Sequence, residues 1–314
     1  MSLEQQQECL SVARWLGMEY VREWMAQYLH GVKPEDVDPT CQIPPHWKKQ
    51  PMPAQGWRAI PISEDDLLRQ LSMVLNPRNA EDLGHGRDCT RWPQYRRLNL
   101  KKAWRVENAL LWRKYDTERA NMKELSKSRL RQMPTVRIRP ELAESTRALP
   151  YPVCTEVNEV FLLHGTKPET VKHILNDGLN ERFSGGLFGS GSYLAEDPEK
   201  SDQYATVDRD GKMLPTDLST ECRSIGDVFY IFVCRTLLGW FVQTKDGETH
   251  LQSGLSIWST RDKRELSYIP GVEPQMTFQS LQVEIGGRVH RNREYILTHS
   301  ERIYPEYLIA YSRS

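Results

Sequence analysis

The sequence lacks the cysteine patterns of disulfide-stapled and zinc-binding proteins. Its six cysteines are spread along 314 residues, and no two of them form a C-x-x-C pair. This spacing favours reduced thiols over a disulfide framework or a zinc site. His85 and Cys89 could share one face of a helix as metal ligands, but no second pair accompanies them. No bound metal is therefore expected.

Long hydrophobic runs are also absent. The most apolar stretch, residues 228–242, is interrupted by Arg235 and is shorter than the roughly 20 residues that span a bilayer. The first eight residues have neither the basic start nor the apolar run of a signal peptide. We therefore expect an intracellular protein, cytoplasmic or nuclear, with no membrane partner.

The chain as a whole has no excess charge of one sign, since Lys and Arg total 42 and Asp and Glu also total 42. The neutral total hides a basic segment, residues 87–139, with 16 Lys or Arg residues against 5 Asp or Glu residues. This segment keeps nucleic acid open as a partner. The side chains expected to contact it are Arg91, Arg96, Arg97, Lys101 and Lys102, with Trp92 and Tyr95 stacking on bases. The alternative is a solvated surface whose charges pair with acidic neighbours in the fold.

The N-terminal part of the chain differs from the rest in its spacing of apolar residues and in its many prolines. Apolar residues in positions 3–30 have nearly helical spacing, and six prolines in residues 39–62 predict an extended connection. A short helix is expected over residues 64–75, with Ser63 as its N-cap. We therefore expect residues 1–85 to be a mainly helical, proline-interrupted region of unknown role and residues 86–314 to be the second domain.

The second domain mixes strands with helices, which predicts an α+β fold. Helices are expected over residues 109–130, 167–177 and from 197 to about 204. Strands are expected over residues 98–106, 160–163, 228–238, 279–284, 294–298 and 307–311.

Glycine-rich turns in this domain bring together residues suited to bind a ligand. His164-Gly165-Thr166 ends the apolar strand 160–163 with a glycine whose backbone can approach a ligand closely. Further along, residues 189–195 and 200–204 place Tyr193, Ser201 and Tyr204 around a turn and one helical turn. The two tyrosine rings could hold a planar aromatic group between them.

These segments resemble the catalytic domain of the poly(ADP-ribose) polymerases. The matching blocks occur in the family's order and are residues 161–166, 187–196, 200–204, 293–297 and 304–309. The resemblance covers about residues 98–312 and is greatest to the tankyrase-type and mono-ADP-ribosylating members. It implies an ADP-ribosyltransferase fold, in which two mostly antiparallel sheets surround a cleft for NAD⁺.

The resemblance also implies a role for individual residues. The catalytic triad would be His164, Tyr193 and Glu294. The residues implied to bind NAD⁺ are His164, Gly165, Thr166, Tyr193, Ala195, Lys200, Ser201 and Tyr204. Glu294 would bond the 2′-hydroxyl of the nicotinamide ribose, and a carboxylate suits the oxocarbenium-like charge that develops when a glycosidic bond breaks.

The implied function is an NAD⁺-dependent glycosyl transfer. ADP-ribose would pass from NAD⁺ to a macromolecular acceptor, protein being the first expectation, and nicotinamide would be released. Two alternatives stay open: a transferase that acts on nucleic acid through residues 87–139, and an inactive module that binds NAD⁺ or ADP-ribose. Departures from the family pattern at Ser192, Leu194 and residues 279–281 leave the acceptor and the product length open.

Overall fold

The computed structural model describes residues 43–47, 52–86, 89, 95–127, 133–181, 185–215, 218, 226–272, 275–286, 289 and 291–314. The helices expected within residues 3–30, as well as Arg91 and Trp92, lie outside these residues. The described helices are α3 (Asp65–Val74), α4 (Ala109–Lys127), α5 (Pro140–Arg147), α6 (Pro168–Asp177) and α7 (Pro198–Asp202). The strands are β1 (Trp57–Pro61), β2 (Leu98–Asn108), β3 (Glu159–Thr166), β4 (Gly185–Gly186), β5 (Gly189–Ser190), β6 (Ser192–Ala195), β7 (Phe229–Leu237), β8 (Phe241–Lys245), β9 (Ser280–Glu284), β10 (Glu294–Leu297) and β11 (Ile303–Arg313).

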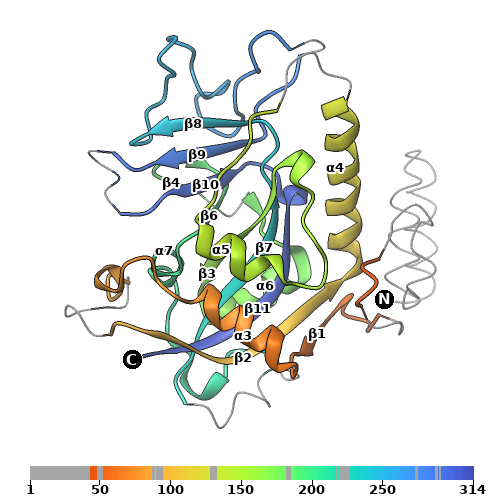
Figure 1. The fold of residues 1–314 in the computed structure, drawn as a ribbon, viewed down its shortest axis with the longest axis vertical. Coiled ribbons are helices and arrows are strands. Elements are labelled where there is room, and N and C mark those ends of the chain that lie inside the picture. The colour runs from red at the N-terminus through yellow and green to blue at the C-terminus, as the bar shows by residue number, and fades with distance from the viewer. Residues whose placement is uncertain are drawn as a thin grey trace, which may run out of the picture.

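Within the described ranges, nine of these strands form one sheet in the order β1-β2-β11-β7-β3-β6-β10-β9-β8 (Figure 1). Every neighbouring pair is antiparallel except β8 and β9, which are parallel. Strands β3 and β6 are joined through one residue pair alone, Leu163 opposite Ala195. The sheet therefore behaves as two halves that meet at a narrow junction, and the α+β fold with mostly antiparallel sheets is confirmed.

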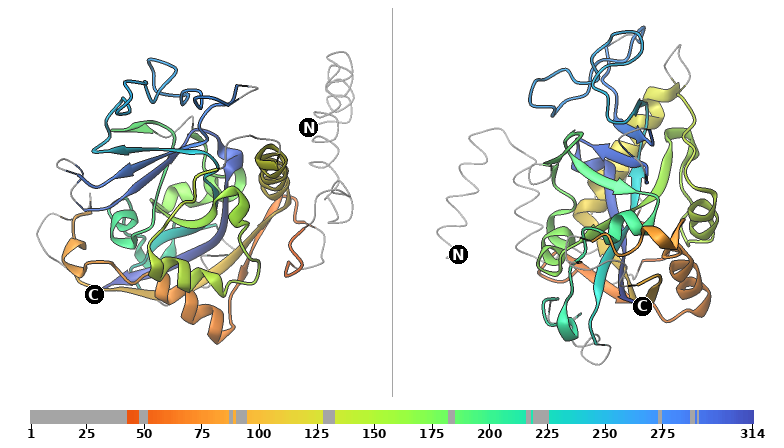
Figure 2. Two further views of the ribbon diagram at one scale, coloured as in Figure 1. Left: turned by 45° about the horizontal axis from the view of Figure 1, so that its top comes forward. Right: turned by 90° about the vertical axis from the view of Figure 1, so that its left-hand side faces the viewer.

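The central strand β7 explains why its sequence is an unbroken apolar run. It lies between β11 and β3, and all nine of its residues are buried. A strand that is covered on both faces has no solvent side, so polar and apolar residues need not alternate along it. Helices α5 and α6 contact the strands of this half, and α3 packs on α5 (Figure 2). In both views of Figure 2, the long segment that follows β8 extends beyond the other half of the sheet.

The N-terminal residues that the structure describes belong to the same packed unit. Strand β1 pairs with β2 along its whole length, from Trp57 opposite Asn108 to Pro61 opposite Trp104. Leu71 and Val74 of α3 are fully buried in the core that also contains Trp104. The expected division between residues 85 and 86 therefore runs through one packed unit. The prolines in residues 39–62 predicted a connection, so β1 was not expected. The structure accommodates Pro61 because proline is tolerated at the end of an edge strand.

Local sequence patterns predicted most of the described helices correctly, but some helix caps and short elements were not predicted. Helix α3 begins after Glu64 instead of Ser63, and neither side chain caps it. Helix α4 follows the expected course, and residues 128–130 lie outside the described residues. Sequence analysis did not predict α5, β6, β8 or the β4–β5 hairpin.

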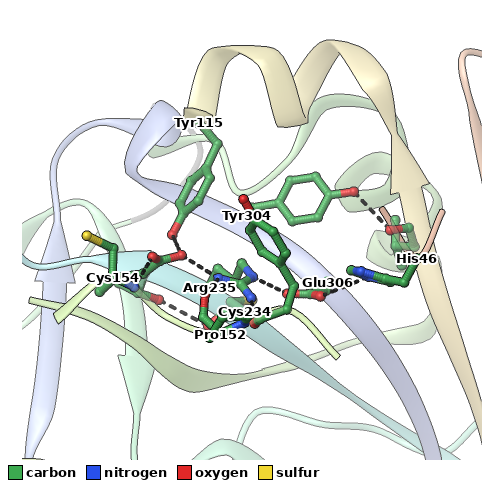
Figure 3. Close-up of polar contacts among 12 residues, drawn as sticks. His46, Tyr115, Pro152, Cys154, Cys234, Arg235, Tyr304 and Glu306 are labelled. Atoms are coloured by element: carbon green, nitrogen blue, oxygen red, sulfur yellow. Dashed lines mark hydrogen bonds and ion pairs between the residues drawn. The ribbon is translucent and has the colours of Figure 1, made fainter. Parts of the chain in front are cut away.

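A buried arginine connects three strands of the larger half of the sheet (Figure 3). Arg235 of β7 is fully buried, its Nη1 lies 2.6 Å from Oε1 of Glu159 in β3, and its Nε donates to Glu306 in β11. Tyr115 of α4 donates to the same Glu159 oxygen at 2.8 Å, and His46 Nε2 lies 3.6 Å from Oε1 of Glu306. Burial alone would raise the pKa of Glu306, but Arg235 and His46 outweigh burial and lower it. Arg235 thus pairs with two carboxylates and links β3, β7 and β11 to α4 and to residues 43–47.

We predict that Arg235→Met lowers the free energy of unfolding by about 3–5 kcal/mol, because it leaves two buried carboxylates without their shared cation. Urea unfolding followed by tryptophan fluorescence measures this loss. The control is Arg69→Met, which removes an exposed pair with Asp66 on α3 and should cost less than about 1 kcal/mol. Equal losses in the two variants would contradict the structural role given to Arg235.

Candidate active site

A cavity opens where the two halves of the sheet separate. Its walls come from β3, β6, α7, β10 and the residue positions just after α7. The lining residues are Leu163, His164, Gly165, Tyr193, Leu194, Ala195, Lys200, Ser201, Tyr204 and Glu294. The structure thus brings together seven of the eight residues expected to bind NAD⁺, along with Glu294. Thr166 is the exception. It is buried opposite Tyr230 and lines neither this cavity nor a second cavity beside α6.

Gly165 is required by the close approach of β3 to α7. A Cβ atom at this position would lie 1.7 Å from the backbone oxygen of Ser201, a distance at which no side chain fits. The Ser201 hydroxyl is buried and has no hydrogen-bond partner among the described residues. A buried polar group without a partner is costly, so this hydroxyl is suited to a ligand that supplies one.

His164 provides a neutral acceptor at the cavity wall. Its Nδ1 lies 2.9 Å from the carbonyl oxygen of Tyr193, and because a carbonyl only accepts, Nδ1 carries the proton. Burial lowers the pKa of His164, and the hydrogen bond to Tyr193 offsets part of that effect. The ring is therefore neutral at pH 7, which leaves Nε2 as an acceptor for a hydroxyl group.

Tyr193 lines the cavity, while its hydroxyl is hydrogen-bonded to the backbone of the β4–β5 hairpin. The hydroxyl donates to the carbonyl of Gly189 at 2.8 Å and accepts from the backbone N–H of Phe188 at 3.0 Å. Burial raises the pKa of Tyr193 to about 12. Both observations make the hydroxyl a poor proton donor or acceptor toward a substrate.

Glu294 and Lys200 form an ion pair at the cavity wall. Glu294 lies in β10 between Ala195 of β6 and Val283 of β9, and only 6% of its surface is exposed. Its Oε1 is 3.0 Å from Nζ of Lys200, which also lies 5.5 Å from the ring centroid of Tyr204. The carboxylate is therefore held in one place by a rigid strand on one side and by a cation on the other.

Buried carboxylates hold α7 in place. Asp202 accepts hydrogen bonds from the hydroxyls of Tyr95 and Tyr311, both at 2.5 Å, and from Arg313 at 2.9 Å. Glu199 accepts the backbone N–H groups of Arg78 and Asn79. Sequence analysis did not assign these acids a role, because an acidic stretch in isolation is typical of a solvated helix.

A second cavity adjoins the first and shares His164 with it. Its other lining residues come from α6 and the turn after it: Thr170, His173, Ile174, Asp177, Gly178, Leu179 and Asn180. Its volume is about 360 Å³, against about 70 Å³ for the first cavity. This cavity was not predicted, because the sequence of residues 167–177 shows only the pattern of a helix.

Two positions that depart from the family pattern have structural partners here. The Ser192 hydroxyl is buried near the carbonyl of Leu179, and Oε1 of Gln279 accepts the backbone N–H of Trp240 at 2.9 Å. These contacts explain the residues at both positions without reference to an acceptor.

The basic segment is partly neutralised where the structure describes it. Arg105 pairs with Glu107, Arg119 with Asp116, and Arg139 with Asp197. Of the expected nucleic-acid contacts, Arg96 is exposed but pairs with Glu81 at 2.7 Å, Arg97 and Lys101 are exposed, and Lys102 is half-buried. Tyr95 was expected to stack on bases, but it is buried with its hydroxyl on Asp202, so that expectation is wrong. A nucleic-acid partner stays a prediction.

The described residues offer neither a metal site nor a membrane-spanning helix. No three His, Cys, Asp or Glu side chains in those ranges gather closely enough to hold a metal ion. None of the helices described there combines the length and hydrophobicity of a bilayer span.

Comparison with known proteins identifies the family. The model of the "Poly(ADP-ribose) polymerase catalytic domain" matches residues 86–313. A relative named "Poly [ADP-ribose] polymerase tankyrase" from Caenorhabditis elegans is 28% identical over 182 residues, which are 51% of this chain and 7% of that protein. The chain therefore matches a small part of that relative's length. Since the family match covers most of the chain and includes every wall of the first cavity, the chain belongs to the poly(ADP-ribose) polymerase catalytic-domain family.

Proposed function

We propose that this chain transfers ADP-ribose from NAD⁺ to a protein acceptor and releases nicotinamide. The observation that carries the proposal is the unpartnered, buried Ser201 hydroxyl beside Gly165 in a cavity that also contains two tyrosines and a paired carboxylate. A carboxamide has both a donor and an acceptor and would satisfy that hydroxyl. Nicotinamide would then lie in the first, narrower cavity, with its ring between Tyr193 and Tyr204.

The two adjoining cavities suit the two halves of NAD⁺. The narrow one is lined by the two tyrosines that would stack on a flat ring, and the larger one, of about 360 Å³, has room for a nucleoside. His164 borders both cavities, so its Nε2 is suited to accept a hydrogen bond from a ribose hydroxyl between them.

The chemistry of bond cleavage agrees with the distribution of charges. When the bond between ribose C1′ and the cationic ring nitrogen breaks, the ring keeps the bonding electrons and leaves as neutral nicotinamide, so no proton donor is needed. Positive charge then develops on the ribose, and the Glu294 carboxylate stabilises it. An acceptor nucleophile forms the new bond to C1′ and passes its proton to the Glu294 carboxylate. Lys200 keeps the carboxylate in position for both events.

The first prediction concerns the packing of β3 on α7. Gly165→Ala should displace α7, because its Cβ would overlap the Ser201 carbonyl, and affinity for nicotinamide-like aromatic amides should fall at least about tenfold, or about 1.4 kcal/mol. Titration calorimetry measures the affinity. The control is Gly185→Ala, since a Cβ there meets no atom within 4 Å. Unchanged binding in Gly165→Ala would exclude this wall from the ligand site.

A second prediction tests the stacking of the ring. Tyr204→Ala should weaken binding of the same amides by about 0.5–1.5 kcal/mol beyond the loss from buried area, because one face of the ring loses its aromatic partner. Tyr204→Phe keeps the ring and should bind nearly as well as the wild type. If both variants bind equally well, Tyr204 does not stack on the ligand.

A third prediction separates catalysis from binding. Glu294→Gln should reduce kcat by about 10²- to 10³-fold while NAD⁺ affinity stays nearly unchanged, because the carboxylate acts mainly on charge that develops in the transition state. Nicotinamide release and mass spectrometry of the modified acceptor measure the reaction. Glu248→Gln, at an exposed position, is the control. Activity of Glu294→Gln within about tenfold of the wild type would refute the catalytic role, and binding without turnover in the wild type would favour the inactive NAD⁺-binding module.

A further inference from the structure

The β4–β5 hairpin connects the tyrosine of the candidate site to a distant part of the chain. Both hydrogen bonds of the Tyr193 hydroxyl go to the backbone of this hairpin, at Phe188 and Gly189. The hairpin also lies directly on the ring, since a Cβ at Gly186 would be 2.7 Å from Cζ of Tyr193. The position of the ring therefore depends on the position of the hairpin.

The hairpin has little to hold it in place by itself. It consists of two strands of two residues each, and Leu187 at its tip is 82% exposed. An isolated two-stranded hairpin is at best marginally stable in water. Packing on the side away from Tyr193 therefore contributes to the position of the hairpin.

Trp258 supplies that packing from the segment after β8. Its indole ring lies against Gly189, where φ is +125° and an added Cβ would be 2.5 Å from Cζ2 of Trp258. The ring is 8% exposed, in a cluster with Phe188 of the hairpin and Ile296 of β10. The neighbouring turn adds a backbone contact, because the N–H of Ser190 donates to the carbonyl of Lys263 at 2.9 Å.

We propose that Trp258 is a positioning residue for Tyr193: it fixes the hairpin, and the hairpin holds the ring where it faces the nicotinamide. This inference rests on the proposed function. The contacts run from Trp258 to Gly189 and from Gly189 to the Tyr193 hydroxyl. The alternative is that Trp258 only fills the core, in which case its removal lowers stability without acting through Tyr193.

A double-mutant cycle on the full chain distinguishes these two roles. Trp258→Ala should weaken binding of 3-aminobenzamide about tenfold and raise KM for NAD⁺ by a similar factor, with a smaller change in kcat. Trp258→Phe should restore binding to within about threefold, because a flat ring again covers Gly189. In the Tyr193→Phe background, where the hydroxyl is missing, Trp258→Ala should change amide binding less than about twofold.

Trp240→Ala is the matched control, since Trp240 is also buried, with 2% of its surface exposed, but belongs to another cluster, with Ile269 and Val272. It should lower the melting temperature and leave amide binding unchanged. If Trp258→Ala does not fold, Trp258→Leu replaces it. Equal effects of Trp258→Ala with and without the Tyr193 hydroxyl, or the same loss of binding in Trp240→Ala, would overturn the inference. Absence of nicotinamide release by the wild type would instead refute the proposed function, and the amide-binding cycle would still test the link from Trp258 to Tyr193.

Discussion

The single residue pair that joins β3 to β6 is the constraint on which the candidate site depends. In the part of the chain that the structure describes, Leu163 and Ala195 are the only paired positions between these strands, so beyond them the two halves of the sheet diverge. The cavity lies in the opening, and both halves supply its walls. His164 and Gly165 come from the half that contains the Arg235 network, whereas Tyr193 and Glu294 come from the other half. If more residues of β3 and β6 were paired, the cavity would close. If none were paired, the two walls of the cavity would not be aligned.

Helix α7 holds this arrangement from a third side, and its anchors are distant from it along the chain. Asp202 binds Tyr95, which precedes β2, and Tyr311 and Arg313, which end β11. Glu199 binds backbone groups near residue 78. Since Ser201 and Lys200 lie between these carboxylates on one helical turn, their positions are fixed by residues that do not contact the cavity. Arg78, Asn79 and Tyr95 therefore contribute to the site by holding α7 in place.

The chemistry proposed for the site explains how its polar groups are divided. A leaving group that departs as a neutral molecule needs no proton, so the Tyr193 hydroxyl is free to hold the hairpin. The carboxylate that must respond to developing charge is instead placed on β10, which has a neighbouring strand on each side, and is paired with Lys200. The ring of Tyr193 and the carboxylate of Glu294 thus have separate supports, the first from the segment after β8 and the second from the sheet and α7.

The sequence by itself determined the family, most of the strands and most of the residues that line the first cavity, because these depend on local order. An apolar run such as residues 228–238 and motifs such as residues 164–166 are visible without knowledge of their neighbours. The tertiary structure alone decided which carboxylates pair with Arg235, why Gly165 cannot have a side chain, and that Thr166 lies away from the cavity. It also revealed β1, the second cavity and the contact of Trp258 with Gly189. Each of these depends on groups that are distant along the chain and meet only after the sheet has formed, so no local pattern of residues could specify them.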